Sequence, residues 1–350
     1  MSEVMRFGLI GAGAIGKIRA DALKLSDVCE LVAVSDLDEA RARGVAPGAQ
    51  FYPDAHDLIE AANVDAIIIS TPPSLHESLA IAAASAGKHV LVEKPMAATS
   101  DACERMITAA KAAGTLLTVG YNHRYFEALK LVRDVVRSGE IGSLSHVRAY
   151  TGHSGLAEFK AEWMYDKNMM GGGALMDNGT HLIDLVRYII GDPTEVFGFA
   201  TNKVWKLGVE DEGIALLRTP EGTTASIEAS WHECRGYRFH IEAYGDRGMA
   251  RAYYAPMMAT VVRLDKPGGS KSVQRNFYPK TIFREKLKGW QSTVIQTFVE
   301  ELADFVAASK GAPHSGRLAG ATDGLRAVQI AQATYASERS RERVKLPALP

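Results

Sequence analysis

The sequence has few cysteines, no long apolar run and no excess of charge of one sign. The three cysteines, Cys29, Cys103 and Cys234, are odd in number and far apart, so they form neither a disulfide framework nor a metal-ligand cluster. The 40 basic and 41 acidic residues give a net charge of −1 without long runs of one sign, so neither nucleic acid nor an anionic membrane is indicated as a partner. No segment is apolar enough to span a membrane, and residues 1–6 lack a signal-peptide pattern. We expect a cytoplasmic protein with a small-molecule partner.

The length of 350 residues, with 47% hydrophobic residues, suffices for two domains that each bury a core. No internal repeat, heptad pattern or low-complexity linker interrupts the chain. The first third alternates short apolar strands with helical segments, which predicts a parallel sheet with helices on its faces. This alternation stops soon after the strand Leu116–Gly120. We therefore expect one domain over residues 1–122 and a second over residues 123–350.

A glycine-rich turn joins the first predicted strand, Phe7–Ile10, to a segment with helical character that begins at Lys17. In a dinucleotide-binding fold the first glycine of G-x-G-x-x-G permits a tight turn, the second lets the backbone approach a pyrophosphate, and the third lets the helix pack on the strand. The N–H groups at the start of the helix then face the phosphate charge. The turn consists of Gly11, Ala12, Gly13, Ala14, Ile15 and Gly16.

The second predicted strand, Cys29–Ser35, is followed by Asp36, which lies 20 positions after Gly16. A dinucleotide fold places its ribose-binding acid at this spacing. A carboxylate there accepts a hydrogen bond from a ribose 2′-hydroxyl and repels a 2′-phosphate, so NAD is favoured over NADP. Arg41 and Arg43 are interpreted as part of the solvated face of the next helix.

Ligands of parallel α/β sheets lie outside the carboxyl ends of the strands. The strand Ala66–Ser70 and the strand His89–Val92 end at such positions. The residues expected there on the cofactor side are Ser70, Thr71, Pro72, Glu93 and Lys94. His76, near the start of the following helix, either contacts the cofactor or is a packed, hydrogen-bonded histidine.

The second part of the chain contains alternating segments typical of a half-exposed, mainly antiparallel sheet. Residues 266–270 form a turn between two of them, and residues 293–308 and 320–337 are predicted amphipathic helices. The charge run over residues 337–345 is interpreted as a solvated face and tail. The predicted strands are Ser145–Tyr150, Gly213–Leu217, Thr223–Trp231, Tyr237–Tyr244, Thr260–Leu264 and Lys271–Phe277.

One predicted helix, Gly171–Asp184, begins with three glycines and carries Asp177, His181 and Asp184 at spacings of four and three, on one face. Gly179 inside this helix costs about 1 kcal/mol relative to alanine, which suggests a close approach to the backbone. Polar residues on a shared face are often only solvated. A metal site is also conceivable, but the sequence offers no third ligand set, so no metal is expected.

These motifs together resemble the glucose–fructose oxidoreductase / inositol dehydrogenase (Gfo/Idh/MocA) family. The resemblance rests on the glycine turn, on Thr71-Pro72 with His76, on the segment 86–95 that ends in Glu-Lys-Pro, and on Gly172-Gly173 with Asp177 and His181. It implies a Rossmann domain followed by a substrate-binding α/β domain whose largely antiparallel sheet commonly forms the interface of homodimers or homotetramers.

The resemblance also implies an NAD-dependent dehydrogenase that transfers hydride between nicotinamide and a CH–OH group. Lys94 would hold the developing negative charge on oxygen, and His181 would be the acid/base, since the ordinary imidazole pKa of about 6.5 suits proton exchange near neutrality. Asp177 would orient the substrate or tune this pair.

The expected substrate is a sugar, cyclic polyol or nucleotide sugar. Asn122, His123 and Arg124 fall where family members carry substrate-pocket residues, although Asn122-His123 differs from the arginine-rich versions of this segment. The loop 153–170, with Lys160, Trp163 and Tyr165, could close the pocket or supply interface aromatics. Two alternatives remain: a glycoside-cleaving enzyme that retains NAD and oxidises its sugar transiently, and a non-catalytic dinucleotide sensor.

Overall fold

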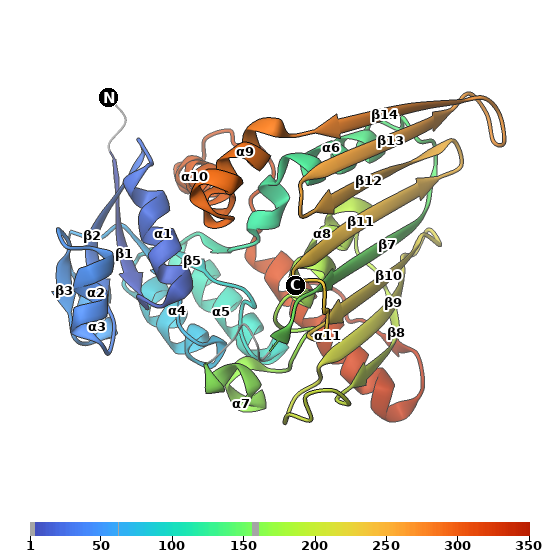
Figure 1. Cartoon of the computed structure of the whole chain (residues 1–350). Coiled ribbons are helices and arrows are strands. Elements are labelled where there is room, and N and C mark those ends of the chain that lie inside the picture. The colour runs from blue at the N-terminus through green and yellow to red at the C-terminus, as the bar shows by residue number, and fades with distance from the viewer. Residues whose placement is uncertain (1–3, 62, 156–160) are drawn as a thin grey trace. The chain divides into compact units, whose positions relative to one another are not determined.

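The computed structural model describes residues 4–61, 63–155 and 161–350, which form two compact units (Figure 1). The first unit comprises the chain up to Tyr125 together with Arg284–Leu325, and the second comprises Phe126–Phe283 and Arg326–Pro350. The sequence-based division placed the boundary after residue 122, whereas the first unit continues to Tyr125 and also includes residues 284–325. No helix within the described residues is long and apolar enough to cross a membrane.

The first unit contains a six-stranded parallel sheet with strand order β3-β2-β1-β4-β5-β6. This is the order of the dinucleotide-binding Rossmann fold. The strands are β1 (Met5–Ile10), β2 (Cys29–Ser35), β3 (Gln50–Tyr52), β4 (Ala66–Ile69), β5 (His89–Val92) and β6 (Leu117–Val119). The helices are α1 (Ala14–Lys24), α2 (Glu39–Val45), α3 (Ala55–Glu60), α4 (His76–Ser85), α5 (Ser100–Ala113) and α10 (Gln291–Ser309), with short 3-10 turns η1 (Pro73–Leu75) and η2 (Asn122–Tyr125).

Helix α10 belongs to the first unit because its apolar face completes that unit's core. Phe298, Leu302 and Phe305 are buried in one cluster with the apolar residues of β1 and α1, and the ring of Phe305 lies 5.6 Å from that of Phe7. The central strand β4 is buried along its whole length, as expected for a strand covered on both faces. The amphipathic pattern predicted the helix, but the domain on which it packs depended on tertiary contacts.

The second unit contains a nine-stranded sheet with order β14-β13-β12-β11-β7-β10-β9-β8-β15. Neighbouring strands are antiparallel except for the parallel pair β7 and β10. The strands are β7 (Leu144–Gly152), β8 (Glu195–Thr201), β9 (Glu212–Arg218), β10 (Thr224–Ser230), β11 (Arg238–Gly245), β12 (Gly248–Tyr254), β13 (Met258–Leu264), β14 (Lys271–Phe277) and β15 (Val344–Lys345). The other elements are α6 (Glu127–Arg137), η4 (Glu162–Tyr165), α7 (Lys167–Met170), α8 (Gly179–Ile190), α9 (Pro279–Lys288) and α11 (Ala321–Ser340).

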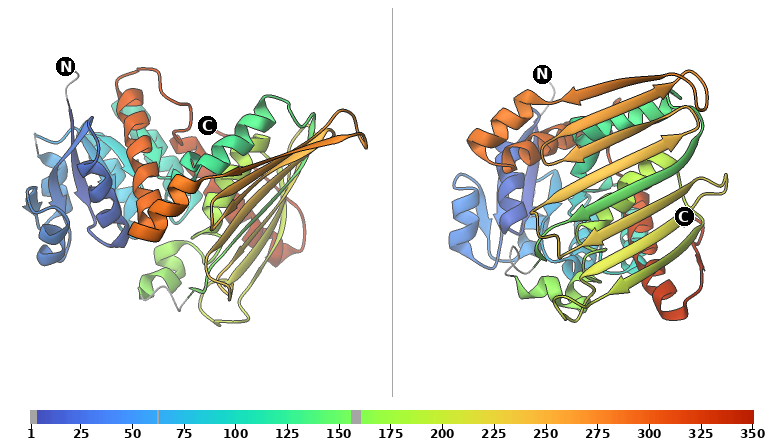
Figure 2. Two further views of the ribbon diagram at one scale, coloured as in Figure 1. Left: turned by 45° about the horizontal axis from the view of Figure 1, so that its top comes forward. Right: turned by 45° about the vertical axis from the view of Figure 1, so that its right-hand side comes forward.

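Within the described residues, the helices that pack on this sheet lie against one of its faces. Helix α6 contacts β12 and β13, and α8 contacts β7 and β10. The left view of Figure 2 shows the sheet nearly edge-on with these helices on one side, and the right view shows the other face uncovered by any drawn helix of the second unit. On β10 the side chains alternate, since Ala225, Ile227 and Ala229 are buried while Ser226 and Glu228 are half-buried.

Two details differ from the sequence-based expectation. Helix α8 begins at Gly179, so Asp177 lies in the turn before the helix and not on its face. A Cβ at Gly179 would approach the Cβ of Ala229 to 3.1 Å, so packing of α8 on β10 accounts for this glycine. The C-terminal charge run is not only a solvated tail, because Val344 and Lys345 pair with β8.

Candidate active site

The turn between β1 and α1 has the geometry that a dinucleotide phosphate requires. Gly11 has φ +92°, and a Cβ there would come 2.6 Å from the Ser70 carbonyl oxygen. A Cβ at Gly16 would overlap the carbonyl of Gly11, whereas a Cβ at Gly13 would meet no atom of the described chain within 4 Å. Helix α1 has no acidic residue in its first turn and no side-chain cap. The turn therefore leaves helix N–H groups and open space beside Gly13, which fits a pyrophosphate.

Asp36 is tied to this turn by a contact that the sequence pattern did not predict. Its Oδ2 accepts a hydrogen bond from the backbone N–H of Ala12 at 2.7 Å, and its Oδ1 accepts one from the N–H of Asp38 at 2.9 Å. Each carboxylate oxygen retains a lone pair for a ribose hydroxyl. Arg41 is exposed on α2, in agreement with its interpretation as part of a solvated face, and its Nη1 lies 3.6 Å from Oδ1 of Asp36.

The ends of β1 and β4 meet where the strand order reverses. The N–H of Ser70 donates to the carbonyl of Ile10 at 2.8 Å, which places residues 70–72 beside the glycine turn. The hydroxyls of Ser70 and Thr71 are buried without a hydrogen-bond partner in the described parts of the chain. Buried hydroxyls normally find partners, so these two groups fit hydrogen bonds to a cofactor.

Glu93, immediately before Lys94, belongs to a buried ion cluster. Its carboxylate accepts from Nε of Arg19 at 2.6 Å, and Nη1 of Arg19 donates to Glu301 of α10 at 2.5 Å. The Arg19 guanidinium also lies 3.5 Å from the ring centre of Phe298. The Glu93 side chain thus binds Arg19, and this ion pair holds in place the backbone segment that carries Lys94.

The 3-10 turn η2 contains three residues predicted to bind substrate. The Asn122 side-chain amide donates to the Thr297 hydroxyl at 3.0 Å, and Arg124 pairs with Asp323 at 3.2 Å. Burial, and secondly the charge of Lys94, lower the pKa of His123 to about 3. His123 is therefore neutral at ordinary pH and near Lys94, whereas Asn122 and Arg124 make contacts that stabilise the first unit.

In the second unit, the glycines before α8 are required by close packing. Glu210 accepts hydrogen bonds from the N–H groups of Gly173 and Leu175 at 2.8 and 3.0 Å, and from the Tyr335 hydroxyl at 2.7 Å. A Cβ at Gly173 would overlap the Glu210 backbone, and one at Gly172 would overlap the Tyr335 hydroxyl. This carboxylate holds the turn that presents Asp177.

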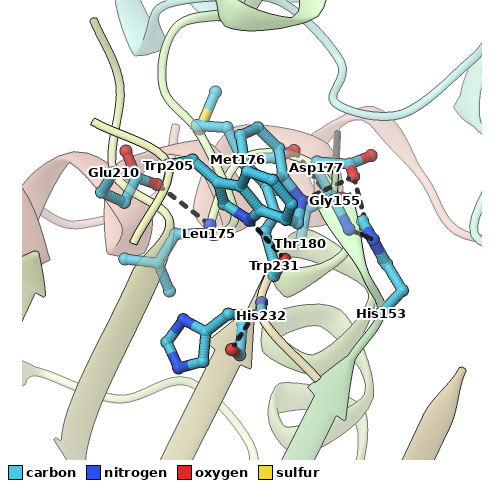
Figure 3. Close-up of polar contacts among 11 residues, drawn as sticks. His153, Gly155, Leu175, Met176, Asp177, Thr180, Trp205, Glu210, Trp231 and His232 are labelled. Atoms are coloured by element: carbon cyan, nitrogen blue, oxygen red, sulfur yellow. Dashed lines mark hydrogen bonds and ion pairs between the residues drawn. The ribbon is translucent and has the colours of Figure 1, made fainter. Parts of the chain in front are cut away.

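Asp177 is held by two residues that the sequence analysis did not select. Its Oδ2 lies 3.2 Å from Nε1 of Trp231 and 3.4 Å from Nε2 of His153 (Figure 3). The N–H of Gly155 donates to Nδ1 of His153 at 3.0 Å, so Nδ1 is an acceptor and the ring proton of neutral His153 is on Nε2, facing Asp177. Two donors therefore fix Oδ2 of Asp177. No local spacing signals this arrangement, because the three residues come from separate segments.

Aromatic residues surround this carboxylate. The Tyr165 ring meets the Trp231 ring edge to face at 5.8 Å, and burial together with the Asp177 charge raises the pKa of Tyr165. The same two causes raise the pKa of Tyr237. Trp163 is half-exposed on η4, and Lys160 lies outside the described residues.

The predicted site residues divide between the two units. The first unit contains all the predicted cofactor-binding residues and some predicted substrate-binding residues, namely the glycine turn, Asp36, residues 70–72, His76, Glu93, Lys94 and residues 122–124. The second unit contains Trp163, Tyr165, Asp177 and His181. Among the described residues, no group of three or more His, Cys, Asp or Glu side chains is placed to hold a metal ion.

Comparisons with known proteins match both the first and the second part of the chain. Residues 5–121 match the oxidoreductase family with an NAD-binding Rossmann fold, and residues 129–251 match the GFO/IDH/MocA C-terminal domain. The chain is 31% identical to myo-inositol 2-dehydrogenase of Thermotoga maritima, covering 98% of each protein, and 32% identical to inositol 2-dehydrogenase of Azotobacter vinelandii, covering 99% of this chain and 98% of that protein.

Among solved structures, levoglucosan dehydrogenase in complex with NADH and L-sorbose superposes with a TM-score of 0.88 at 25% identity, covering 99% of this chain and 100% of that chain. An oxidoreductase domain protein from Kribbella flavida gives a TM-score of 0.86 at 26% identity, with the same coverage. These comparisons confirm the expected enzyme class and cofactor. They favour a dehydrogenase over the alternative of a non-catalytic dinucleotide sensor. The chain belongs to the Gfo/Idh/MocA oxidoreductase family and is an NAD-dependent dehydrogenase acting on CH–OH groups.

Proposed function

We propose that this dehydrogenase oxidises a ring hydroxyl of a cyclic polyol or sugar, with myo-inositol as the first substrate to test. The observation that carries the proposal is the Asp177 carboxylate, fixed at Oδ2 by Trp231 and His153 among aromatic rings. Carboxylates bind hydroxyl pairs, and aromatic rings cover the apolar faces of sugar rings. The names of the inositol 2-dehydrogenases and of levoglucosan dehydrogenase support the same substrate class.

In this proposal NAD, when bound, supplies the hydride acceptor. The Lys94 ammonium stabilises the negative charge that develops on the reacting oxygen, and His181 accepts the hydroxyl proton. Asp177 orients the substrate through its carboxylate, whose Oδ2 is held by Trp231 and His153. The glycine turn and Asp36 bind the dinucleotide.

The test is a panel of inositols, monosaccharides, anhydrosugars and nucleotide sugars offered with NAD, with NADH absorbance as the signal. We expect a cyclic polyol or sugar to give turnover, and no turnover with any of them would contradict the proposal. Glycosides are included because cleavage without net NADH, by protein that retains NAD, would indicate the transient-oxidation mechanism instead.

Removal of the Asp36 charge is expected to narrow the preference for NAD over NADP by about 10-fold or more, since repulsion between nearby charges contributes ~1–4 kcal/mol. Asp36→Asn retains an oxygen for the Ala12 N–H, so it isolates the charge, whereas Asp36→Ala also loosens the glycine turn. Arg41→Ala is the control and should widen the preference, because a nearby cation favours the 2′-phosphate. Equal binding of both cofactors by the unmodified protein in calorimetry would refute this expectation.

The uncovered face of the nine-stranded sheet is expected to form a homo-oligomer interface. It exposes Phe199 (49%) and Leu216 (47%) on β8 and β9, and farther across the same sheet Arg251 pairs with Glu242 at 3.5 Å. An exposed apolar face with mixed charge is suited to self-association.

Light scattering at micromolar concentration should give a multiple of the 37.8 kDa chain mass. Leu216→Glu should shift the protein toward the monomer, because a carboxylate would be buried at the interface. Leu25→Glu, a substitution at an exposed leucine outside this sheet, should leave the mass unchanged. A monomeric unmodified protein would overturn the expectation.

A further inference from the structure

His76 lies at the start of α4 and is completely buried. Its Nε2 is 2.8 Å from the carbonyl oxygen of Thr71, and its Nδ1 is 3.1 Å from that of Pro95 and 3.2 Å from that of Met96. Both ring nitrogens therefore face the backbone. Both polar atoms of the imidazole are thus engaged by the protein itself.

These carbonyls come from two different turns. Thr71 follows β4, next to the glycine turn, and Pro95 and Met96 follow β5, directly after Lys94. Strands β4 and β5 are neighbours, and a backbone hydrogen bond at their ends runs from the N–H of Glu93 to the carbonyl of Ile69 at 2.9 Å. The His76 ring spans the gap beyond the strand ends and links the cofactor-side turn to the turn that bears Lys94.

The two ring nitrogens of His76 bind different turns, so each hydrogen-bonded contact can be removed without the other. A carbonyl oxygen only accepts hydrogen bonds, so each ring nitrogen must carry a proton to bind its neighbour. Burial lowers the pKa of His76 despite the opposing effects of the three carbonyls and of the Glu93 charge. A ring with one N–H would bind only one of the two turns at a time, so the link between both turns requires protons on both nitrogens, a form that the three carbonyls and the Glu93 charge favour and burial opposes.

We propose that His76 is a positioning residue for hydride transfer, which fixes the Thr71–Pro72 turn relative to the turn that carries Lys94. The proposal rests on the proposed function, in which Lys94 acts on the reacting oxygen. Errors of about 1 Å in the position of a reacting group can cost about 100-fold in rate. A loosened Lys94 turn should therefore reduce turnover, and a loosened Thr71 turn should reduce NAD affinity.

Two polar substitutions separate the links. An asparagine amide nitrogen occupies roughly the place of Nδ1, so His76→Asn retains a donor for Pro95 and Met96. A glutamine amide nitrogen reaches roughly the place of Nε2, so His76→Gln retains a donor for Thr71. His76→Leu removes both donors at similar volume.

We expect His76→Leu to lower turnover about 10- to 100-fold at saturating substrate and NAD. His76→Asn should recover most of the turnover but bind NAD more weakly. His76→Gln should show the reverse, with near-normal NAD affinity in calorimetry and low turnover. His89→Asn is the control, because the Nδ1 of His89 accepts from the Leu116 N–H at the opposite end of β5. This variant should show no such split between affinity and turnover.

Hydrogen exchange measured by mass spectrometry gives a readout that needs no substrate. Exchange should rise in residues 69–75 for His76→Asn and in residues 93–99 for His76→Gln. If these segments respond as expected while no compound in the panel is oxidised, the proposed function fails and the link stands. The link is overturned if Asn and Gln behave alike in exchange and in NAD affinity, or if turnover in all three variants merely follows the thermal midpoint.

Discussion

Replacement of Lys94 with alanine is expected to lower turnover about 100-fold or more, the scale of losing one positioned electrostatic donor at a developing oxyanion. Affinity for NAD should change far less, because it depends mainly on the glycine turn and Asp36. The measurement is steady-state turnover with the best substrate of the panel, alongside an NAD titration by calorimetry. Near-normal turnover with normal NAD binding would refute the proposed role of Lys94.

Lys88→Ala is a suitable comparison, since Lys88 lies before the opposite end of β5 and donates to the carbonyls of Ala61 and Val64. Its loss should affect stability and not turnover. His181→Ala should also reduce turnover strongly. The double variant of Lys94 and His181 should lose less than the product of the two single losses, because residues that act as one unit are not additive.

Replacement of Arg19 with methionine is expected to cost about 3–5 kcal/mol in the free energy of unfolding at neutral pH, since it leaves buried carboxylates without their cation. Arg19 is completely buried and binds both Glu93 and Glu301, so water cannot replace the lost contact. Urea unfolding followed by tryptophan fluorescence provides the measurement. A loss below about 1 kcal/mol would show that the cluster contributes little, as exposed ion pairs do.

Glu301→Gln is the matched variant for this cluster. Burial raises the pKa of Glu301 to about 7, against the lowering effect of Arg19. The folded protein therefore binds a proton that the unfolded chain releases between the ordinary value of 4.5 and about 7. By linkage, this group's contribution to stability falls as the pH rises through that window. Glu301→Gln cannot ionise, so it should retain the Glu93–Arg19 pair and lose this pH dependence. An unchanged slope between pH 4.5 and 7 would contradict the assignment.

The sequence by itself determined the features that depend on neighbours along the chain. Gly11 needs a positive φ and Gly16 needs close packing, and both requirements follow from a turn of fixed length between a strand and a helix. The spacing to Asp36 and the strand ends at Ser70 and Glu93 follow from the same local regularity. These elements give the Rossmann fold and its cofactor side.

The tertiary structure decided which side chains serve as partners for these residues. His153 and Trp231 reach Asp177 from other segments, and Glu301 lies 282 positions from Arg19. Periodicity and turn chemistry carry no information about such pairs, because they depend on how helices and strands pack. For the same reason the sequence predicted Asn122 and Arg124 only as substrate-binding residues, and their contacts with Thr297 and Asp323 within the first unit emerged from the tertiary structure.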